Sequence, residues 1–356
     1  MSVESGQVSA RESSEKYMAL FVSNFVANTT LIWLTILFYN VNRFYINFLS
    51  PEVKFLLIAI SVVFTVGQIP VLVRGSKRGD FSSGQLFFRA LVRFLSDALG
   101  KLSPEERAQG VVRPNEKLAV LIVVVKVFFV PTMLQFAYIN WSAVVVGWSH
   151  VMQSPISMRA FNQHVWPFML ALIYTIFTLI YCFGYLVQAD FLNNKIKSVE
   201  PTVMGWACTL ICYPPIVGLT AIAPKNYPWD YLNDLVDFGG VVPNFIARVT
   251  MVSCLLIMLW AVATLGSKCS NLTNRGIVTG GPYRFIRHPH YAFKLAHWWI
   301  TLLPVFISVP LAPVFMAGWT SIYFLRAITE ERHLRSDPDY VAYCEKVKYR
   351  FIPGVY

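Results

Sequence analysis

The sequence predicts an all-α integral membrane protein, a polytopic helical bundle of about eight transmembrane helices that ends in a C-terminal helical hairpin. Three observations predict this class. Apolar residues make up 56% of the chain and charged residues only 14%, whereas a soluble domain carries about 25% charged residues. Eight apolar segments each approach the roughly 20 residues that a helix needs to cross the hydrocarbon core. The basic residues fall mainly in alternate connections between these segments.

The apolar segments define the predicted spans in order along the chain. They are Thr29–Phe48, Val53–Val73, Leu118–Trp148, Trp166–Gln188, Thr202–Ala223, Phe245–Leu265, Ala292–Ile307 and Val309–Leu325. The third is long, and Pro131 within it predicts a kink or a break. Pro214 and Pro215 are expected to break the fifth. Only Ser308 separates the last two, so we expect a tight helical hairpin.

The distribution of Lys and Arg predicts the orientation. Nine of them lie in the connection Arg74–Lys117, and the connections after the fourth and sixth segments and the C-terminal tail are basic as well. The opposite connections hold only Arg43, Lys54, Arg159 and Lys225. By the positive-inside rule, both termini of this multi-pass protein are cytoplasmic, which requires an even number of spans. The net charge of +11 then reflects topology and attraction to anionic lipid, with no need for nucleic acid.

These patterns predict three regions. Residues 1–28 form a polar cytoplasmic tail, and residues 29–264 form an N-terminal membrane bundle that includes the cytoplasmic segment 74–117. Residues 265–356 form a separate C-terminal region in which ionisable residues gather. The N-terminal six spans carry no motif that indicates a reaction.

One helix of the segment 74–117 is predicted to be amphipathic. Within Gln85–Leu102, Arg89, Arg93 and Asp97 share the polar face. The apolar face is formed by Phe87, Phe88, Leu91, Phe94, Leu95, Ala98 and Leu102. This spacing favours a helix in the cytoplasmic membrane interface, or one packed on the bundle. The following Ser103-Pro104-Glu105-Glu106 predicts an N-cap, a first-turn proline and a capping glutamate for a further short helix.

Ionisable residues cluster at the two ends of the C-terminal hairpin. The run from Gly280 to Tyr291 enters it and contains Arg284, Arg287 and two histidines, and the run from Arg326 to Leu334 leaves it. Four of the six histidines lie in this region, namely His288, His290, His297 and His333. Singly, these residues have ordinary explanations, such as basic flanks of a span or a pair between Glu330 and Arg326 one turn apart. Together, at a membrane boundary, they indicate a functional site.

This region resembles a known superfamily. The features that carry the resemblance are Arg287-His288-Pro289-x-Tyr291 after a Gly-rich turn, an apolar hairpin, Glu330-Glu331-x-x-Leu334, and a tail with Tyr340, Tyr343, Val347 and Pro353. In this order they are similar to the isoprenylcysteine carboxyl methyltransferase and phospholipid methyltransferase group. The resemblance covers about Leu265–Tyr356, roughly a quarter of the chain.

The resemblance implies a site for S-adenosylmethionine at the cytoplasmic end of the hairpin. The implied cofactor-binding residues are Tyr283, Arg287, His288, Pro289, Tyr291, Glu330 and Glu331. The implied catalytic residues are Glu331, His288 and Arg287. The implied methyl acceptor is a membrane lipid or a lipidated, isoprenylcysteine-like molecule that enters from the bilayer. The sequence indicates neither the identity of this acceptor nor an oligomeric state.

The chain departs from the group's pattern at one place. The group commonly has Gly two residues after the tyrosine, where this chain has Phe293 followed by Lys294. We expect a bulky Phe293 to restrict the approach of a cofactor at this turn. Lys294 is expected to alter which substrate charge is accepted.

Methyl transfer is compatible with these residue types. The methyl group of a sulfonium is already activated, so a protein must mainly align donor and acceptor and exclude water. A carboxylate acceptor needs no base, whereas an amine or hydroxyl needs one, for which Glu331 or His288 is a candidate. Aromatic faces can stabilise a sulfonium by about 0.5–2 kcal/mol each; the candidates are Tyr283, Tyr291, Trp298 and Trp299. The two tryptophans are equally compatible with an interfacial aromatic belt.

Three alternatives remain open at this point. Membrane sterol reductases share a similar hairpin and use NADPH, whose phosphate would suit Arg284, Arg287 and Arg350. However, they typically have Gly-Trp-Trp before the first block, where this chain has Gly281-Pro282-Tyr283. A di-iron hydroxylase would need about eight histidines, whereas this chain has six. The six cysteines form neither a CxxC zinc pattern nor a disulfide framework. No metal site is therefore predicted. A non-enzymatic receptor or scaffold would leave the clustered charges unexplained.

Overall fold

The structure of the chain is a computed structural model, and it describes residues 2–219 and 236–355. Helices dominate the described part of the chain, as predicted. By contact density the chain divides into two compact units, residues 1–131 and residues 132–356. Helix α7 (Pro114–Gln153) belongs to both, since it continues without interruption through Pro131. The predicted functional division at residue 265 stays a prediction.

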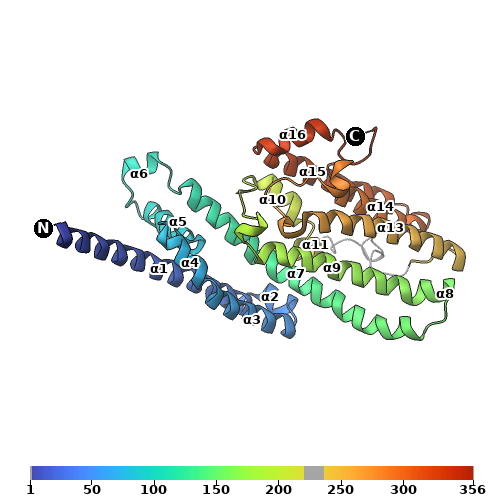
Figure 1. Cartoon of the computed structure of the whole chain (residues 1–356). Helices are drawn as coiled ribbons and strands as arrows, with labels where there is room; N and C mark the ends of the chain where they lie inside the picture. The colour runs from blue at the N-terminus through green and yellow to red at the C-terminus, as the bar shows by residue number, and fades with distance from the viewer. Residues whose placement is uncertain (1, 220–235, 356) are drawn as a thin grey trace. The chain divides into compact units, whose positions relative to one another are not determined.

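The first unit consists of helices joined by short capped turns (Figure 1). Before α7 they are α1 (Ser2–Val41), α2 (Arg43–Phe48), α3 (Pro51–Gly67), α4 (Ile69–Lys77), α5 (Ser83–Ala98) and α6 (Pro104–Ala108). The Asn42 side chain caps α2 and the Ser50 side chain caps α3. The predicted helices in the segment 74–117 are confirmed as α5 and α6. Ser103 and Glu106 form the predicted capping box at the start of α6.

The second unit contains the C-terminal cluster. After α7 its elements are α8 (Met158–Ala160), the π-helical turn η1 (Phe161–Val165), α9 (Trp166–Leu186), the 3-10 turn η2 (Asp190–Leu192), β1 (Ser198–Val199), α10 (Val203–Leu210), α11 (Ile216–Leu219), α13 (Val241–Leu265), the 3-10 turn η4 (Gly266–Lys268), β2 (Thr273–Asn274), the 3-10 turn η5 (Gly281–Arg284), α14 (Pro289–Ser308), α15 (Ala312–Leu334) and α16 (Pro338–Lys346). Strands β1 and β2 pair antiparallel, with Ser198 opposite Asn274.

Five helical stretches in the described part of the chain are long and apolar enough to cross a membrane. They are Ser14–Val41, Pro51–Lys77, Pro114–Gln153, Met158–Leu186 and Val241–Lys268. These correspond to the predicted spans one to four and six. Helices α14 and α15 are not among them, because polar and charged residues such as Lys294, Arg326 and Glu330 interrupt their apolar sequence. The predicted count of eight is therefore not reached by length and composition alone.

The predicted fifth span is not a single helix. Helix α10 ends at Leu210 and α11 begins at Ile216, after the Pro214-Pro215 pair that was expected to break it. The last predicted residues of this span, 220–223, lie outside the described residues. The interruption follows from proline chemistry, since neither proline can donate a helical hydrogen bond.

The contacts of α9 and α13 show that these two helices run in the same direction. At their N-terminal ends, the Asn162 side chain donates a hydrogen bond of 2.9 Å to the Val241 carbonyl. At their C-terminal ends, Asn194 donates one of 3.2 Å to the Ser267 carbonyl. The C-terminal end of α9 and the N-terminal end of α13 therefore lie at opposite ends of a helix of 21 residues, a length of about 31 Å. The predicted fifth span lies in the chain segment between these two ends.

Helices α14 and α15 complete the second unit. Phe293 and Ile300 of α14 pack against Met251, Leu255 and other buried residues of α13. The core between α14 and α15 includes Leu302, Met316 and Tyr323, all almost fully buried. Because α14 and α15 are separated by only three residues and pack along their length, the end of α15 returns to the start of α14 (Figure 1).

Candidate active site

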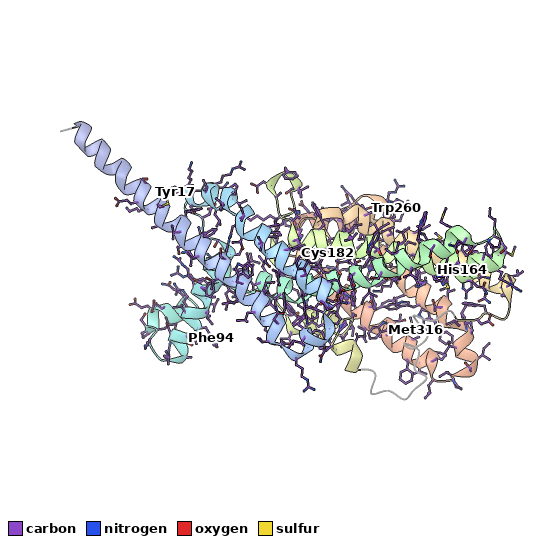
Figure 2. The ribbon with its side chains drawn as sticks, turned by 90° about the horizontal axis from the view of Figure 1, so that it is seen from below. Tyr17, Phe94, His164, Cys182, Trp260 and Met316 are labelled. Atoms are coloured by element: carbon purple, nitrogen blue, oxygen red, sulfur yellow. The ribbon has the colours of Figure 1, made fainter. Side chains whose placement is uncertain are left out.

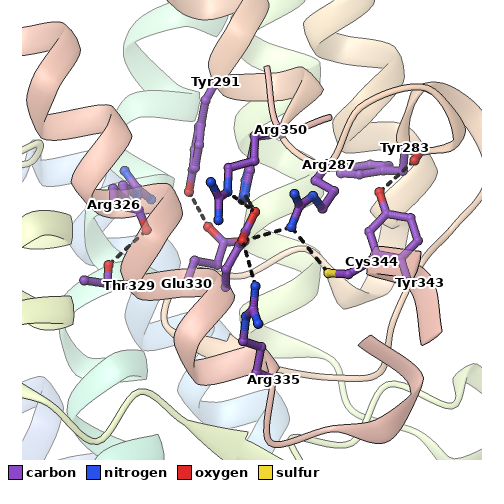
Figure 3. Close-up of polar contacts among 12 residues, drawn as sticks. Tyr283, Arg287, Tyr291, Arg326, Thr329, Glu330, Arg335, Tyr343, Cys344 and Arg350 are labelled. Carbon is purple, nitrogen blue, oxygen red and sulfur yellow. Dashed lines mark hydrogen bonds and ion pairs between the residues drawn. The ribbon is translucent and has the colours of Figure 1, made fainter. Parts of the chain in front are cut away.

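The two ionisable runs of the C-terminal region meet at one end of the second unit. The chain enters α14 through Arg287 and His288, and the final tail runs beside this entry. The Arg287 amide donates to the Tyr349 carbonyl and the His288 amide to the Arg350 carbonyl, each at 2.9 Å. The C-terminal turn of α15 lies next to both segments (Figure 3). Residues about 45 and 60 positions apart in the sequence therefore form one cluster.

A glycine turn positions the residues that precede this entry. Gly281 has a φ of +56°, in the left-handed region that favours glycine, and a Cβ at this position would collide with the Thr264 side chain. The turn leads through η5 to Tyr283, whose backbone carbonyl accepts a hydrogen bond of 2.7 Å from the Tyr343 hydroxyl. The Gly-rich turn is thus needed to hold the entry close to α13.

Glu331 is the centre of the cluster. Its side chain is 2% exposed, and Arg287 Nη1 donates to its Oε2 at 3.0 Å. Its Oε1 lies 3.1 Å from both His288 Nε2 and Arg350 Nε. Arg335, one turn later, approaches to 4.0 Å. The carboxylate of Glu331 therefore joins the start of α14, the end of α15 and the C-terminal tail.

The surroundings of Glu331 favour its charged form. Burial by itself would raise the pKa of this carboxyl group. The hydrogen bond with His288 and the positive charge of Arg287 oppose that effect, and the net result is a pKa below the ordinary value. Glu331 is thus a negatively charged anchor that is saturated with cationic partners.

Glu330 has a different environment, although it is the neighbouring residue. Its Oε2 accepts a hydrogen bond of 2.7 Å from the Tyr291 hydroxyl, and its side chain is exposed. Glu330 lines a pocket that we call the site pocket, whereas Glu331 is not among the lining residues in the described part of the chain. Of the two neighbouring glutamates, Glu330 therefore faces the site pocket and Glu331 lies outside its wall.

The site pocket brings together most of the predicted cofactor-binding residues. Those on its wall are Tyr283, Arg287, His288, Tyr291 and Glu330. Pro289 is not among them, because it lines a separate apolar groove with Phe293, Ala296 and Phe324. The remaining wall of the site pocket comes from α9, Glu200, α10, α13, the turn 270–273, α14 and α15.

Phe293 does not have the predicted effect on the pocket. It packs against the buried residues shared by α9 and α13, and it faces the apolar groove rather than the site pocket. Lys294 lies over the rings of Trp298 and Tyr323, with its Nζ 4.9 and 5.3 Å from the ring centres. The departure from the group's pattern therefore does not block the site pocket.

Arg326 is a pocket residue whose role the sequence did not reveal. It is buried and donates a hydrogen bond to the Asn271 side chain. Its guanidinium carbon lies 5.3 Å from the ring centre of Tyr291. The simple pair with Glu330 one turn away is not observed among the described contacts. Arg326 precedes Glu330 by four residues and therefore lies on the same face of the helix. This spacing is the feature of the sequence that could have marked Arg326 as a pocket residue.

A second carboxylate in the pocket comes from a distant part of the chain. Glu200 is buried, accepts from Arg332 Nη2 at 3.3 Å, and lies 4.0 Å from His333 Nδ1. The other ring nitrogen of His333 lies 2.8 Å from the Ser198 hydroxyl. Burial lowers the pKa of His333 despite the opposing charge of Glu200. Glu200 also accepts hydrogen bonds from the amide and hydroxyl of Thr202, but its partners Arg332 and His333 lie more than 130 residues away, so the sequence alone does not mark it as a pocket residue.

The four histidines of the region occupy separate places. His288 contacts Glu331, and His333 contacts Ser198. The ring of His290 stacks on Phe177 with 5.2 Å between centroids, and His297 lies against Trp166. In the described part of the chain these imidazoles therefore do not converge on one point.

Comparison with known protein families supports the resemblance found in the sequence. Residues 246–336 match the model of the isoprenylcysteine carboxyl methyltransferase family. The matched residues run from α13 to the end of α15 and include both ionisable runs. The predicted resemblance is confirmed over this region. No curated protein matches the chain.

Proposed function

We propose that the protein is an S-adenosylmethionine-dependent methyltransferase of the membrane. Its acceptor is a lipid or a prenylated, isoprenylcysteine-like molecule at the cytoplasmic interface. The main support is that the stretch matching a methyltransferase family, residues 246–336, supplies the two ends that meet at the site pocket. The apolar helices of the chain agree with a membrane location.

The residues of the site pocket fit this cofactor chemically. S-adenosylmethionine carries a positively charged sulfonium, an amino acid group and a nucleoside with hydroxyls and ring nitrogens. The wall offers the carboxylates of Glu330 and Glu200 and the aromatic faces of Tyr283 and Tyr291. His290 Nδ1 is buried without a hydrogen-bond partner in the described part of the chain. Carboxylates and aromatic rings favour a cation, and an unpaired buried nitrogen is available for a polar group of a ligand.

The proposed roles of the chain's residues follow from these contacts. When bound, S-adenosylmethionine supplies an activated methyl group. Glu330 and the tyrosine rings stabilise its positive charge, and the buried walls exclude water. A carboxylate acceptor then needs no base. For an amine or hydroxyl acceptor, His288 takes the proton, because it lines the pocket and its imidazole is oriented by Glu331.

Arg287 and Glu331 receive different parts in this proposal. Arg287 lines the pocket and can contact an anionic group of the acceptor or the cofactor. Glu331 holds Arg287 and His288 in place, since both of its oxygens are engaged by these residues and by Arg350. We therefore assign Glu331 a positioning role instead of direct contact with the reacting atoms.

The apolar groove suggests how a lipid tail is accommodated. Its wall is almost entirely apolar and includes Trp260 of α13, Ala296 of α14 and Phe324 of α15. Pro289 in this groove directly follows His288 in the site pocket. A hydrocarbon chain in the groove would therefore lie within reach of a polar head at the pocket.

A reductase that uses NADPH is the second function considered from the sequence. The family match does not support it, since the matched family transfers methyl groups. Binding of NADPH is nevertheless the competing outcome in a binding experiment. The phosphate of the dinucleotide would need the basic residues at the start of α14, among them Arg287.

The test is ligand-induced thermal stabilisation of the full chain in detergent. We expect S-adenosylhomocysteine to raise the Tm and NADP to leave it unchanged. Glu330→Gln should weaken the response to S-adenosylhomocysteine by about tenfold in apparent Kd, as loss of a charged hydrogen bond implies. The matched control is Glu345→Gln, an exposed glutamate of α16, which should respond like the wild type. A response to NADP alone would overturn the methyltransferase proposal.

A further inference from the structure

Helix α5 in the first unit carries an apolar surface that no part of the described chain covers. We call it the α5 stripe, and it consists of Leu91 (42% exposed), Phe94 (60%), Leu95 (50%) and Leu99 (67%), the last being the residue that caps the helix. At 100° per residue these side chains fall within one sector of the helix. Phe94 is labelled on α5 in Figure 2. Such a contiguous exposed patch marks an interaction surface.

The beginning of α5 is attached to two membrane-spanning helices at their basic end. The Gly84 amide donates to the Asn28 side chain of α1 at 2.9 Å, and a Cβ on Gly84 would collide with the Asn28 backbone. Asn24, one turn earlier on α1, bonds to Ser76 and to the carbonyl of Asp80 at the end of α4. The last turn of α4 holds basic residues, which mark the edge of the hydrocarbon layer.

The far half of α5 is attached to the start of another span. Arg93 Nε lies 3.2 Å from Glu116 Oε1 in the first turn of α7, and Glu116 is 3% exposed. The next residue, Lys117, belongs to the same basic connection. Because both halves of α5 are tied to the basic ends of spans, the helix must follow the membrane edge.

The charges around the stripe indicate which kind of surface covers it. Arg89 projects from the polar side of α5, with its guanidinium 3.8 Å from the centre of the Phe81 ring. A groove between α1 and α5 is lined by Ser23, Gln85, Arg89 and Arg93. Basic and hydroxyl groups thus stand beside the apolar stripe, as in helices that lie in an anionic membrane surface.

We propose that α5 is an in-plane interfacial helix that inserts the α5 stripe among lipid acyl chains and selects anionic headgroups at its basic side. The occupant is the bilayer surface itself. A basic residue near such a surface contributes ~1 kcal/mol, roughly a fivefold preference for anionic lipid. This role does not depend on the proposed methyl transfer.

The experiment is site-specific photocrosslinking of the full chain in lipid nanodiscs. p-Benzoylphenylalanine replaces Phe94 or Leu95 in the stripe and, as the control on the opposite side of α5, Ser96, which lines the groove between α1 and α5. The nanodiscs contain phosphatidylcholine, either alone or mixed with phosphatidylglycerol. We expect several-fold more lipid adduct at positions 94 and 95 than at position 96. Among the adducts, phosphatidylglycerol should exceed its bulk share, and Arg89→Gln should reduce that excess.

Three outcomes would overturn the proposal. Equal lipid labelling at 94 and 96 would show that α5 does not lie in the interface. Adducts with peptides of this chain or of a second copy at 94 and 95 would assign the stripe to a protein contact. Adducts that match the bulk lipid ratio would remove the preference for anionic headgroups.

Discussion

At the scale of single residues, the two neighbouring glutamates of α15 have different roles: Glu331 holds the cluster together, whereas Glu330 faces the site pocket. Consecutive residues of a helix point about 100° apart, so Glu330 and Glu331 face different surroundings. Glu331 is buried among Arg287, His288 and Arg350, whereas Glu330 is exposed at the site pocket and bonded to Tyr291. A buried charge needs such partners, because removing it from water costs several kcal/mol.

Removal of the Glu331 charge should therefore destabilise the protein. Glu331→Gln leaves Arg287 and the partly buried Arg350 facing a neutral group at a buried position, and we expect the free energy of unfolding to fall by about 3–5 kcal/mol. The measurement is the Tm of the detergent-solubilised chain. In Glu345→Gln, which alters an exposed glutamate of α16, the change should stay within about 0.5 kcal/mol. A wild-type Tm for Glu331→Gln would mean that the cluster contributes nothing to the fold.

The same carboxylate predicts a dependence of stability on pH. Since the folded-state pKa of Glu331 lies below its ordinary value of 4.5, its contribution is complete above that value and is lost as the pH falls through the lower, folded pKa. The Tm difference between wild type and Glu331→Gln should therefore be constant near neutral pH and shrink in acid. A difference that instead shrank on going from pH 5 to about 8 would assign the effect to another group.

At the scale of secondary structure elements, close approach of α9 to the turn after α13 fixes the floor of the site pocket. Gly184 of α9 lies against the backbone of Cys269, and no side chain fits between them. Tyr185, the next residue, accepts a hydrogen bond of 2.7 Å from the Asn271 amide. Asn271 in turn accepts from Arg326 of α15. One glycine thus permits a chain of contacts that links three elements.

Substitution of Gly184 should separate these elements. In Gly184→Ala the added Cβ would overlap the Cys269 carbonyl, and we expect a loss of about 1–3 kcal/mol or more, together with weaker binding of S-adenosylhomocysteine. Gly318→Ala in α15 is the matched control, since nothing lies within 4 Å of a Cβ there. That variant should gain about 0.5–1 kcal/mol from helix propensity. Equal Tm values for the two variants would contradict this packing.

At the scale of the whole molecule, the direction of the helices bears on membrane topology. Five stretches satisfy the length and hydropathy of a span, which alone would place the termini on opposite sides. However, α9 and α13 run parallel, so the end of α9 and the start of α13 lie at opposite ends of this helix pair. Helix α14 then packs along α13, and α15 returns along α14. The location of both termini on one side of the membrane stays a prediction from the distribution of the basic residues.

Tags at the two termini test this orientation. In sealed membrane vesicles of known sidedness, an epitope before Met1 and another after Tyr356 should both be accessible from the cytoplasmic side, because the basic connections are retained there. Accessibility is measured by protease treatment with and without detergent. Protection of only one tag would show that the number of crossings is odd, and the predicted location of the C-terminal site would have to change.

Local patterns in the sequence predicted much of the fold and part of the candidate site. Apolar runs gave the helices that could span a membrane, and Ser103 with Glu106 gave a capping box. The order of the two ionisable runs predicted that Arg287 and His288 lie near Glu330 and Glu331. These features depend on residues close in sequence or on motifs with a fixed order, so they can be read without coordinates.

Long-range packing decided the rest. Glu200, Asn271 and Arg326 converge on the site pocket through contacts between segments 55 to 132 residues apart. The direction in which Phe293 points, the different environments of the two glutamates and the parallel course of α9 and α13 likewise depend on packing between elements. The sequence by itself therefore determined the membrane class and the pairing of the two runs. Only the tertiary structure decided which side chains face the pocket, because that depends on how helices pack and not on the order of residues within them.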